Sequence, residues 1–91
     1  MELLLDPANL IFDPKEGLLH FTAIEGREFL ECCISLAALA ALAHDSILGR
    51  NAMIRALQGH RSVIRQIVER KYRSRQFDDG DKLVIGLEDV P

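Results

Sequence analysis

The spacing of apolar residues changes at Ser35, and this change restricts the fold to strands followed by helices. Before Ser35, residues 18–23 alternate apolar with polar side chains, the period of two expected for a strand with one buried face. After it, residues 36–43 are strong helix formers throughout. A chain of 91 residues is too short to be divided into two cores. We therefore predict a single α+β domain over residues 1–91.

Two strands are predicted to form an antiparallel hairpin. They cover residues 18–23 and 27–34, and Gly26 between them can take the positive φ of a tight turn. A two-layer domain follows if the helices pack on one face of this hairpin.

The two ends of the chain are less regular. We expect residues 1–17, which contain two prolines, to be a loosely structured lead-in with a short strand at residues 10–12 at most. Near the other end, a turn is predicted at residues 78–81 and a last strand at residues 83–87. With two helices before it, this strand can join the sheet antiparallel to the second hairpin strand or parallel to the first.

The first predicted helix covers residues 36–43, and Ser35 is a good N-cap for it. This helix is apolar on every side, which is typical of a helix that is surrounded by protein or presented to a partner. It is therefore a candidate self-association surface. Its leucines are Leu36, Leu39 and Leu42.

The second predicted helix covers residues 52–73, with Asn51 as its cap. Glycine weakens a helix by roughly 1 kcal/mol relative to alanine, so Gly59 is the position at which we expect any kink or break of this helix. At 100° per residue, one broad apolar stripe contains Met53, Ile54, Leu57, Ile64, Ile67, Val68 and Tyr72.

Positive charge is concentrated in the second helix, although the chain has a net charge of −3. Residues 50–75 contain eight Arg or Lys and one acidic residue. We interpret this as a solvated face whose charges are balanced by the acidic remainder of the chain. The alternative is binding of nucleic acid or another phosphate ligand, because guanidinium groups pair well with phosphate. The candidate contacts are Arg55, Arg65, Arg70, Arg73 and Arg75.

Other chemistry has weaker support in the sequence. His60 lies inside the apolar stripe and Arg61 at its edge, and with Cys32 they form a candidate pocket, although a structural role is favoured for the histidine. Cys32 and Cys33 are neighbours, so we expect free thiols, and their spacing does not suit a metal site. The sequence contains no nucleotide-binding loop and no nucleophile elbow, so we predict no cofactor, no metal and no catalytic residue.

No apolar run reaches the roughly 18 residues that a membrane span needs, so no membrane contact is expected. The acidic start Met1-Glu2 does not fit a signal peptide. Free thiols suit a reducing compartment, and we expect a cytoplasmic protein.

Three segments resemble the uncharacterised bacterial family known as domain of unknown function 1488. They are Cys32-x-Ile34-Ser35-x-x-Ala38-Leu39, Leu57-x-x-His60-Arg61-x-x-Ile64 and the closing strand at residues 83–87, and the likeness spans about residues 12–87. Leu57 replaces a bulkier aromatic of the family, and Cys33 is an addition. The resemblance implies a compact two-layer α+β fold and a bacterial cytoplasmic setting. It implies no activity, ligand or catalytic residue.

We therefore expect a small non-enzymatic binding or interaction protein that is oligomeric or has a protein partner. Its predicted contact is the apolar helix 36–43 or an exposed strand edge. The alternative is nucleic-acid or phosphate binding through the basic second helix. An enzyme that uses His60, Arg61 and a cysteine is the least favoured hypothesis.

Overall fold

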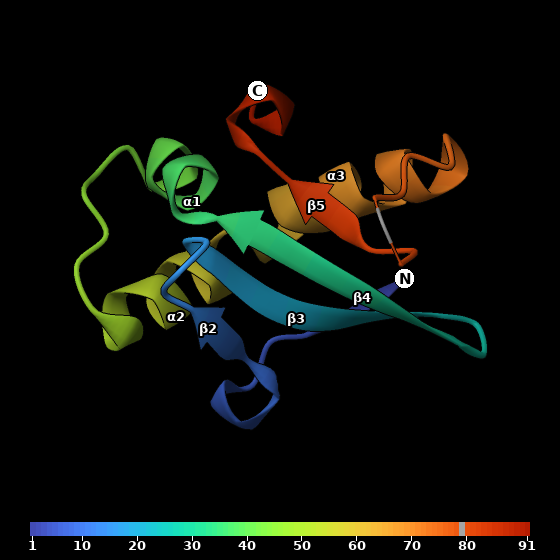
Figure 1. The fold of residues 1–91 in the computed structure, drawn as a ribbon, viewed down its shortest axis with the longest axis horizontal. Coiled ribbons are helices and arrows are strands. Elements are labelled where there is room, and N and C mark those ends of the chain that lie inside the picture. The colour runs from blue at the N-terminus through green and yellow to red at the C-terminus, as the bar shows by residue number, and fades with distance from the viewer. Residues whose placement is uncertain (79) are drawn as a thin grey trace.

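The alternating segment before Ser35 forms the predicted hairpin in the computed structural model, which describes residues 1–78 and 80–91 (Figure 1). Its strands are β3 (Leu18–Glu25) and β4 (Glu28–Ser35), paired from Leu18 with Ser35 to Glu25 with Glu28. Gly26 takes a φ of 60° in the turn, which only glycine adopts at little cost. The described residues form a mixed sheet and helices, so the α+β class is confirmed.

The first 17 residues are more ordered than the sequence predicted. Strands β1 (Glu2–Leu4) and β2 (Ile11–Asp13) pair antiparallel with different halves of β3, and the 3₁₀ turn η1 (Pro7–Asn9) links them. β2 is the short strand that the sequence predicted. The reason for the added order is that β3 would otherwise expose the backbone groups of its second edge. Leucines from this segment also enter the core, namely Leu3, Leu5 and Leu10.

Helix α1 (Leu36–Ala43) begins where the sequence predicted. The Ala38 amide donates to Ser35 Oγ at 3.1 Å, which confirms Ser35 as the N-cap. His44 ends the helix in the left-handed conformation, with a φ of 54°.

The predicted second helix is divided in two, α2 (Arg50–Gly59) and α3 (Arg61–Arg73). The break lies at His60, next to the glycine where the sequence placed a kink or break. Asn51 is not the cap, because α2 begins earlier. Gly49 is the N-cap, and its carbonyl accepts from the Met53 amide at 3.2 Å. The apolar stripe is confirmed, since its members are buried in the core or packed against it.

The last strand, β5 (Leu83–Ile85), pairs parallel with β4, with Cys32 opposite Leu83. Both predicted strand orders were therefore wrong. α2 and then α3 run back along the sheet and return the chain to the end at which β4 begins, so the next strand lies parallel to β4 (Figure 1). The preceding turn has an Asp81 amide that donates to the Asp78 carbonyl at 3.1 Å, while residue 79 of that predicted turn lies outside the described residues.

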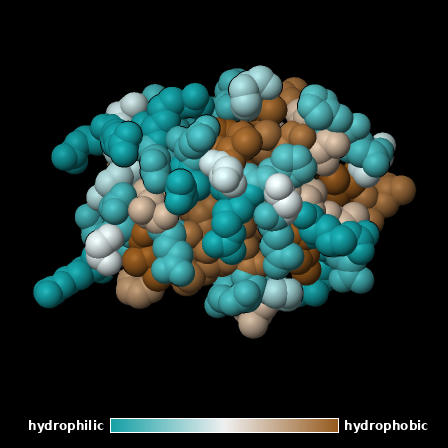
Figure 2. All heavy atoms as spheres, turned by 180° about the vertical axis from the view of Figure 1, so that it is seen from behind, coloured by the Kyte–Doolittle hydropathy of each residue, from teal (hydrophilic) through white to brown (hydrophobic). Residues whose placement is uncertain are grey.

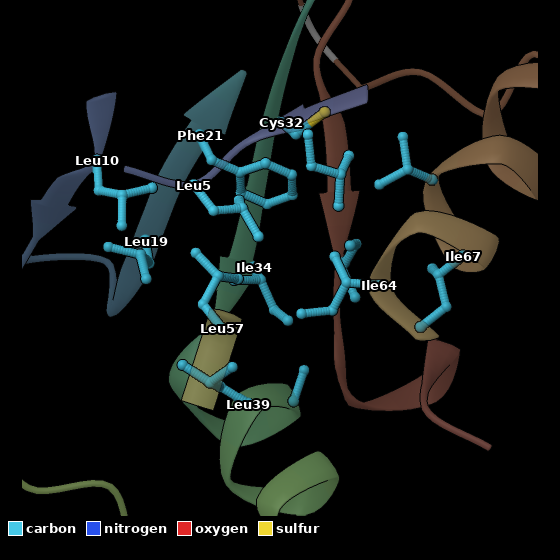
Figure 3. Packing of buried hydrophobic residues seen from close by; sticks show 14 of the residues in the cluster. Leu5, Leu10, Leu19, Phe21, Cys32, Ile34, Leu39, Leu57, Ile64 and Ile67 are labelled. Carbon is cyan, nitrogen blue, oxygen red and sulfur yellow. The ribbon is translucent and has the colours of Figure 1, made fainter. Parts of the chain in front are cut away.

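One hydrophobic core joins the three helices to one face of the sheet. Figure 3 shows Phe21 and Ile34 from the strands, Leu39 and Leu57 from α1 and α2, and Ile64 from α3 pointing into the same space. The C-terminal turn η2 (Leu87–Asp89) closes one end of this layer. There Lys71 Nζ lies 3.1 Å from Asp89 Oδ2, in a nearly buried ion pair. No helix within residues 1–78 and 80–91 has both the length and the apolar character needed to cross a membrane.

Candidate functional site: the helix-free face of the sheet

The second face of the sheet carries no helix in the part of the chain that the structure describes, because α2 and α3 both lie behind the strands (Figure 1). Cross-strand partners point to the same side of a sheet, and successive residues point to opposite sides. The strand pairing therefore separates this face from the core-facing residues. We define the helix-free face as Glu2, Leu4, Ile11, Asp13, Leu18, His20, Thr22, Ile24, Phe29, Glu31, Cys33, Ser35 and Val84.

The helix-free face carries both apolar and polar residues. His20, Thr22 and Glu31 occupy neighbouring positions of β3 and β4 at its middle. Toward its margins, aliphatic and aromatic side chains lie beside the polar Glu2, Asp13 and Ser35. Two of the apolar side chains are largely exposed, Ile11 at 70% and Phe29 at 72%. Isolated exposed apolar residues are common, but several on one flat surface indicate a contact surface.

Two open hollows lie on either side of His20. The larger, of about 400 Å³, has Cys33 and Val84 among its lining residues and charged groups from Glu16, Asp78 and Lys82. The smaller, of about 280 Å³, lies toward Ile11 and also includes Glu31. Their mixed lining and open shape are suited to receiving side chains of another molecule.

The cysteine on this face is not an activated nucleophile. Cys33 is 1% exposed, and burial raises the pKa of its thiol, although Lys82 opposes the shift. The neighbouring Cys32 faces the core, and burial followed by the charge of Cys33 raises its pKa to about 12. Both cysteines are free thiols, as predicted. Because the thiolate is the reactive form of cysteine, a raised pKa makes both thiols weak nucleophiles at neutral pH.

The candidate pocket of His60, Arg61 and Cys32 does not form. Cys32 belongs to the buried core-facing row of β4, whereas Arg61 is exposed at the start of α3. His60 lies at the helix break, and its Nδ1 is 2.8 Å from the Ala56 carbonyl oxygen, which accepts a hydrogen bond from that ring nitrogen. The histidine therefore ends α2, a structural role.

The proposed self-association leucines of α1 are not a surface. Leu39 is fully buried and Leu42 is 8% exposed, while Leu36 packs against the core. The prediction was wrong because these leucines pack within the chain, where α1 contacts β4, α2 and η2.

The five candidate arginines are spread over α2, α3 and the residues that follow, and several have partners within the chain. Arg65 and Arg73 each lie 3.7 Å from a carboxylate oxygen of Glu69, and Arg70 donates to the Asp89 carbonyl at 3.5 Å. Arg55 and Arg75 are exposed. Figure 2 shows hydrophilic residues gathered at its left, the side on which α3 ends.

No metal centre is present among residues 1–78 and 80–91, where no three His, Cys, Asp or Glu side chains are placed to hold one ion. The helix-free face itself was not identified from the sequence. Its signal was available in β3 and β4, where Leu18, Ile24 and Phe29 occupy the positions that alternation reserves for polar residues.

Comparisons with known proteins agree with this fold. The family model described as "Protein of unknown function (DUF1488)" matches residues 7–85. The crystal structure of a DUF1488 family protein of unknown function from Shewanella loihica PV-4 is similar, with a TM-score of 0.78 and 20% sequence identity. The similarity covers 92% of this chain and 89% of that chain, and it supports the fold alone. No curated protein matches the sequence.

Proposed function

From the premise that this chain belongs to the DUF1488 family, we propose that it is a small interaction protein of the bacterial cytoplasm that works by binding and not by catalysis. Its contact surface is the helix-free face of the sheet. This replaces α1 as the contact, because the leucines of α1 are used in the core.

The observation that carries this proposal is the exposure of apolar side chains on a face that no helix covers in the described part of the chain. Ile11 and Phe29 are 70% and 72% exposed, and Leu18, Ile24 and Val84 are only half-buried around them. An antiparallel sheet with one solvated face normally carries polar residues there. Covering this surface would stabilise a complex by roughly 25 cal/mol for each Å² of apolar area buried.

The test is site-specific photo-crosslinking in living bacteria that express the full chain. A photoreactive amino acid in place of Phe29 is expected to give a crosslinked product of defined mass, because this side chain would be covered by the partner. The same amino acid in place of Leu48 is the matched control, since Leu48 is 82% exposed and lies in the loop between α1 and α2.

The outcomes separate clearly. A product from position 29 and none from position 48 supports the helix-free face as the contact surface. No product from position 29, or equal products from both positions, overturns the proposal. The mass of the product identifies whether the partner is a second copy or a different protein.

Phosphate or nucleic-acid binding is the second candidate function. It is favoured by the eight basic residues between positions 50 and 75, against one acidic residue. The ion pairs of Arg65 and Arg73 with Glu69 reduce the charge that is available to a phosphate backbone.

A further inference from the structure

We infer that the hollow between the end of α3 and the start of β4 binds a nucleotide, with the phosphate on two arginines and the base against two aromatic rings. The hollow has a volume of about 300 Å³ and is lined by Glu28, Tyr72, Arg73, Arg75 and Phe77. Glu28 belongs to the row of β4 that faces the helices, so this site is separate from the helix-free face. The inference therefore goes beyond the proposed function and does not depend on it.

Arg75 stands at a backbone position that normally selects glycine. Where α3 ends, the Gln76 amide donates to the Lys71 carbonyl at 2.9 Å. The Arg75 amide donates to the Tyr72 carbonyl at 3.2 Å. These two bonds close a helix through a residue in the left-handed conformation, and Arg75 has a φ of 55°. Glycine adopts this φ at little cost, and arginine does not. Residues held in such conformations cluster at ligand-binding sites, so the position itself indicates a use for the Arg75 side chain.

The two guanidinium groups supply the anion-binding part of the hollow. Arg73 lies in the last turn of α3, and its Nη2 is 3.7 Å from Glu69 Oε2, too far for a hydrogen bond. Basic residues in a last turn often interact with the helix carbonyls, which accounts for Arg73. Arg75 lies beyond the helix and is exposed. Because guanidinium groups bind phosphate oxygens with paired N–H donors, the two side chains fit a phosphate group.

The rest of the lining favours a nucleotide over a simple anion. Tyr72 and Phe77 are half-buried, and their ring centroids lie 6.2 Å apart in an edge-to-face arrangement. Nucleobases stack on aromatic side chains of this kind. The Tyr72 hydroxyl donates to Glu28 Oε1 at 2.9 Å, which holds the ring in place. The Glu28 carboxylate repels a simple anion, but its other oxygen can accept from an N–H group of a base. The phenyl ring of a phosphotyrosine has no such donor.

The test is isothermal titration calorimetry of the purified full chain with guanosine monophosphate, whose base presents two neighbouring N–H donors. We expect saturable binding with a dissociation constant of about 10–1,000 µM. Guanosine and inorganic phosphate should each bind at least tenfold more weakly, because each lacks one part of the ligand. Binding of either as tight as that of the nucleotide overturns the inference, as does no saturation at about 5 mM nucleotide. Tighter binding of phenyl phosphate overturns it in favour of a phosphotyrosine-like ligand.

Arg75→Gly is the variant that separates binding from structure. It should weaken nucleotide binding at least tenfold, because one of two guanidinium groups is lost. It should also raise the urea midpoint of unfolding, because glycine takes a φ of 55° at little cost, so the lost binding cannot result from unfolding. Unchanged binding in this variant overturns the inference.

Arg61→Gln is the charge-matched control. It removes the same charge from the exposed first residue of α3, at the other end of the helix from the hollow. Its dissociation constant is expected to stay within twofold of the unmodified value. Equal weakening by both variants would reflect general electrostatic attraction and would also overturn the inference.

The nucleotide can be free or can stand at the 5′ end of a single strand. A short strand that begins with a phosphorylated guanosine distinguishes these sources. Binding at least tenfold tighter than that of guanosine monophosphate, and lost in Arg75→Gly, identifies the strand end as the ligand. No gain over guanosine monophosphate identifies the free nucleotide, and either result supports the hollow as the site.

Discussion

At the scale of single residues, Cys32 and Cys33 show how one strand can shield two thiols in different ways. They occupy successive positions of β4, so their side chains lie on opposite faces of the sheet. Cys32 is covered by the hydrophobic core, whereas Cys33 lines the larger hollow of the helix-free face and is 1% exposed. Burial raises the pKa of both thiols, that of Cys32 to about 12.

We predict that neither thiol reacts with iodoacetamide at pH 7.5 in the folded protein, because reaction needs an accessible thiolate. Mass spectrometry after a short exposure should show no added group, and the same exposure in guanidinium chloride should show two. Rapid modification of the folded chain would contradict the burial of these cysteines.

The same burial makes stability depend on alkaline pH. The pKa of Cys32 rises from 9.0 to about 12 on folding, so the unfolded chain loses this proton first as the pH increases. The free energy of unfolding should therefore fall between about pH 9 and pH 12 and be insensitive to this group below pH 9. Urea unfolding of Cys32→Ala is the control, because this variant should show a smaller decrease over the same range.

At the scale of elements, the break between α2 and α3 is fixed by His60 more than by Gly59. Gly59 is a helical residue of α2, it is exposed, and an added Cβ would have no heavy atom within 4 Å. His60 has a φ of −115° and a ψ of 25°, outside the helical region, and its ring bonds to the Ala56 carbonyl. The glycine therefore costs helix stability without being required for the bend.

Gly59→Ala should accordingly stabilise the protein by about 0.5 to 1 kcal/mol in urea unfolding, because alanine has less backbone freedom to lose. Gly26→Ala is the matched comparison in an equally open site. Since Gly26 has a φ of 60°, this change should destabilise the protein by about 1 kcal/mol. A destabilising Gly59→Ala would show that the break needs the glycine.

Local sequence patterns predicted the helices and strands better than they predicted which of these elements pair or pack with one another. The hairpin, the Ser35 cap and the apolar stripe depend on residues close in sequence, and all three are confirmed. The pairing of β5 with β4 depends on how α3 is directed after the break, which no nearby residue specifies. The enclosure of α1 likewise depends on η2, more than forty positions further along the chain. Such long-range contacts are decided by packing and not by local preference.

At the scale of the whole molecule, the charges are arranged so that the basic helices are balanced from within. Glu69 lies between Arg65 and Arg73 on one side of α3, and Asp89 accepts contacts from Lys71 and Arg70. The net charge is −3. We interpret the basic surface as a solvated face, as the sequence alone also favoured.

A 20-base-pair duplex therefore should not bind with appreciable affinity at 150 mM salt, where non-specific binders have dissociation constants on the order of 1–100 µM. Fluorescence anisotropy of a labelled duplex would measure this. The Glu69→Gln variant should be measured in parallel. It removes the ion-pair partner of Arg65 and Arg73 and should raise any affinity for the duplex that is seen at low salt. Salt-sensitive micromolar binding that is lost in a Arg70→Glu and Arg73→Glu double variant would instead support the phosphate-binding function.

The site was harder to predict than the fold for a physical reason. Core residues are buried, and the alternation of apolar and polar residues along a strand reveals them. A contact surface consists of apolar residues that no other element of the chain covers. Alternation places Ile24 and Phe29 on the face opposite to the core-facing residues of β3 and β4, but only the position of the helices shows that this second face has no cover in the described part of the chain.

Three-residue strands flank the hairpin on both sides, β1 and β2 beside β3 and β5 beside residues 32–34 of β4. Such short edges offer few free backbone groups for another chain to extend the sheet. Edge-to-edge addition has no natural end and leads to fibres. The short flanking strands therefore protect the folded chain against this kind of open-ended growth.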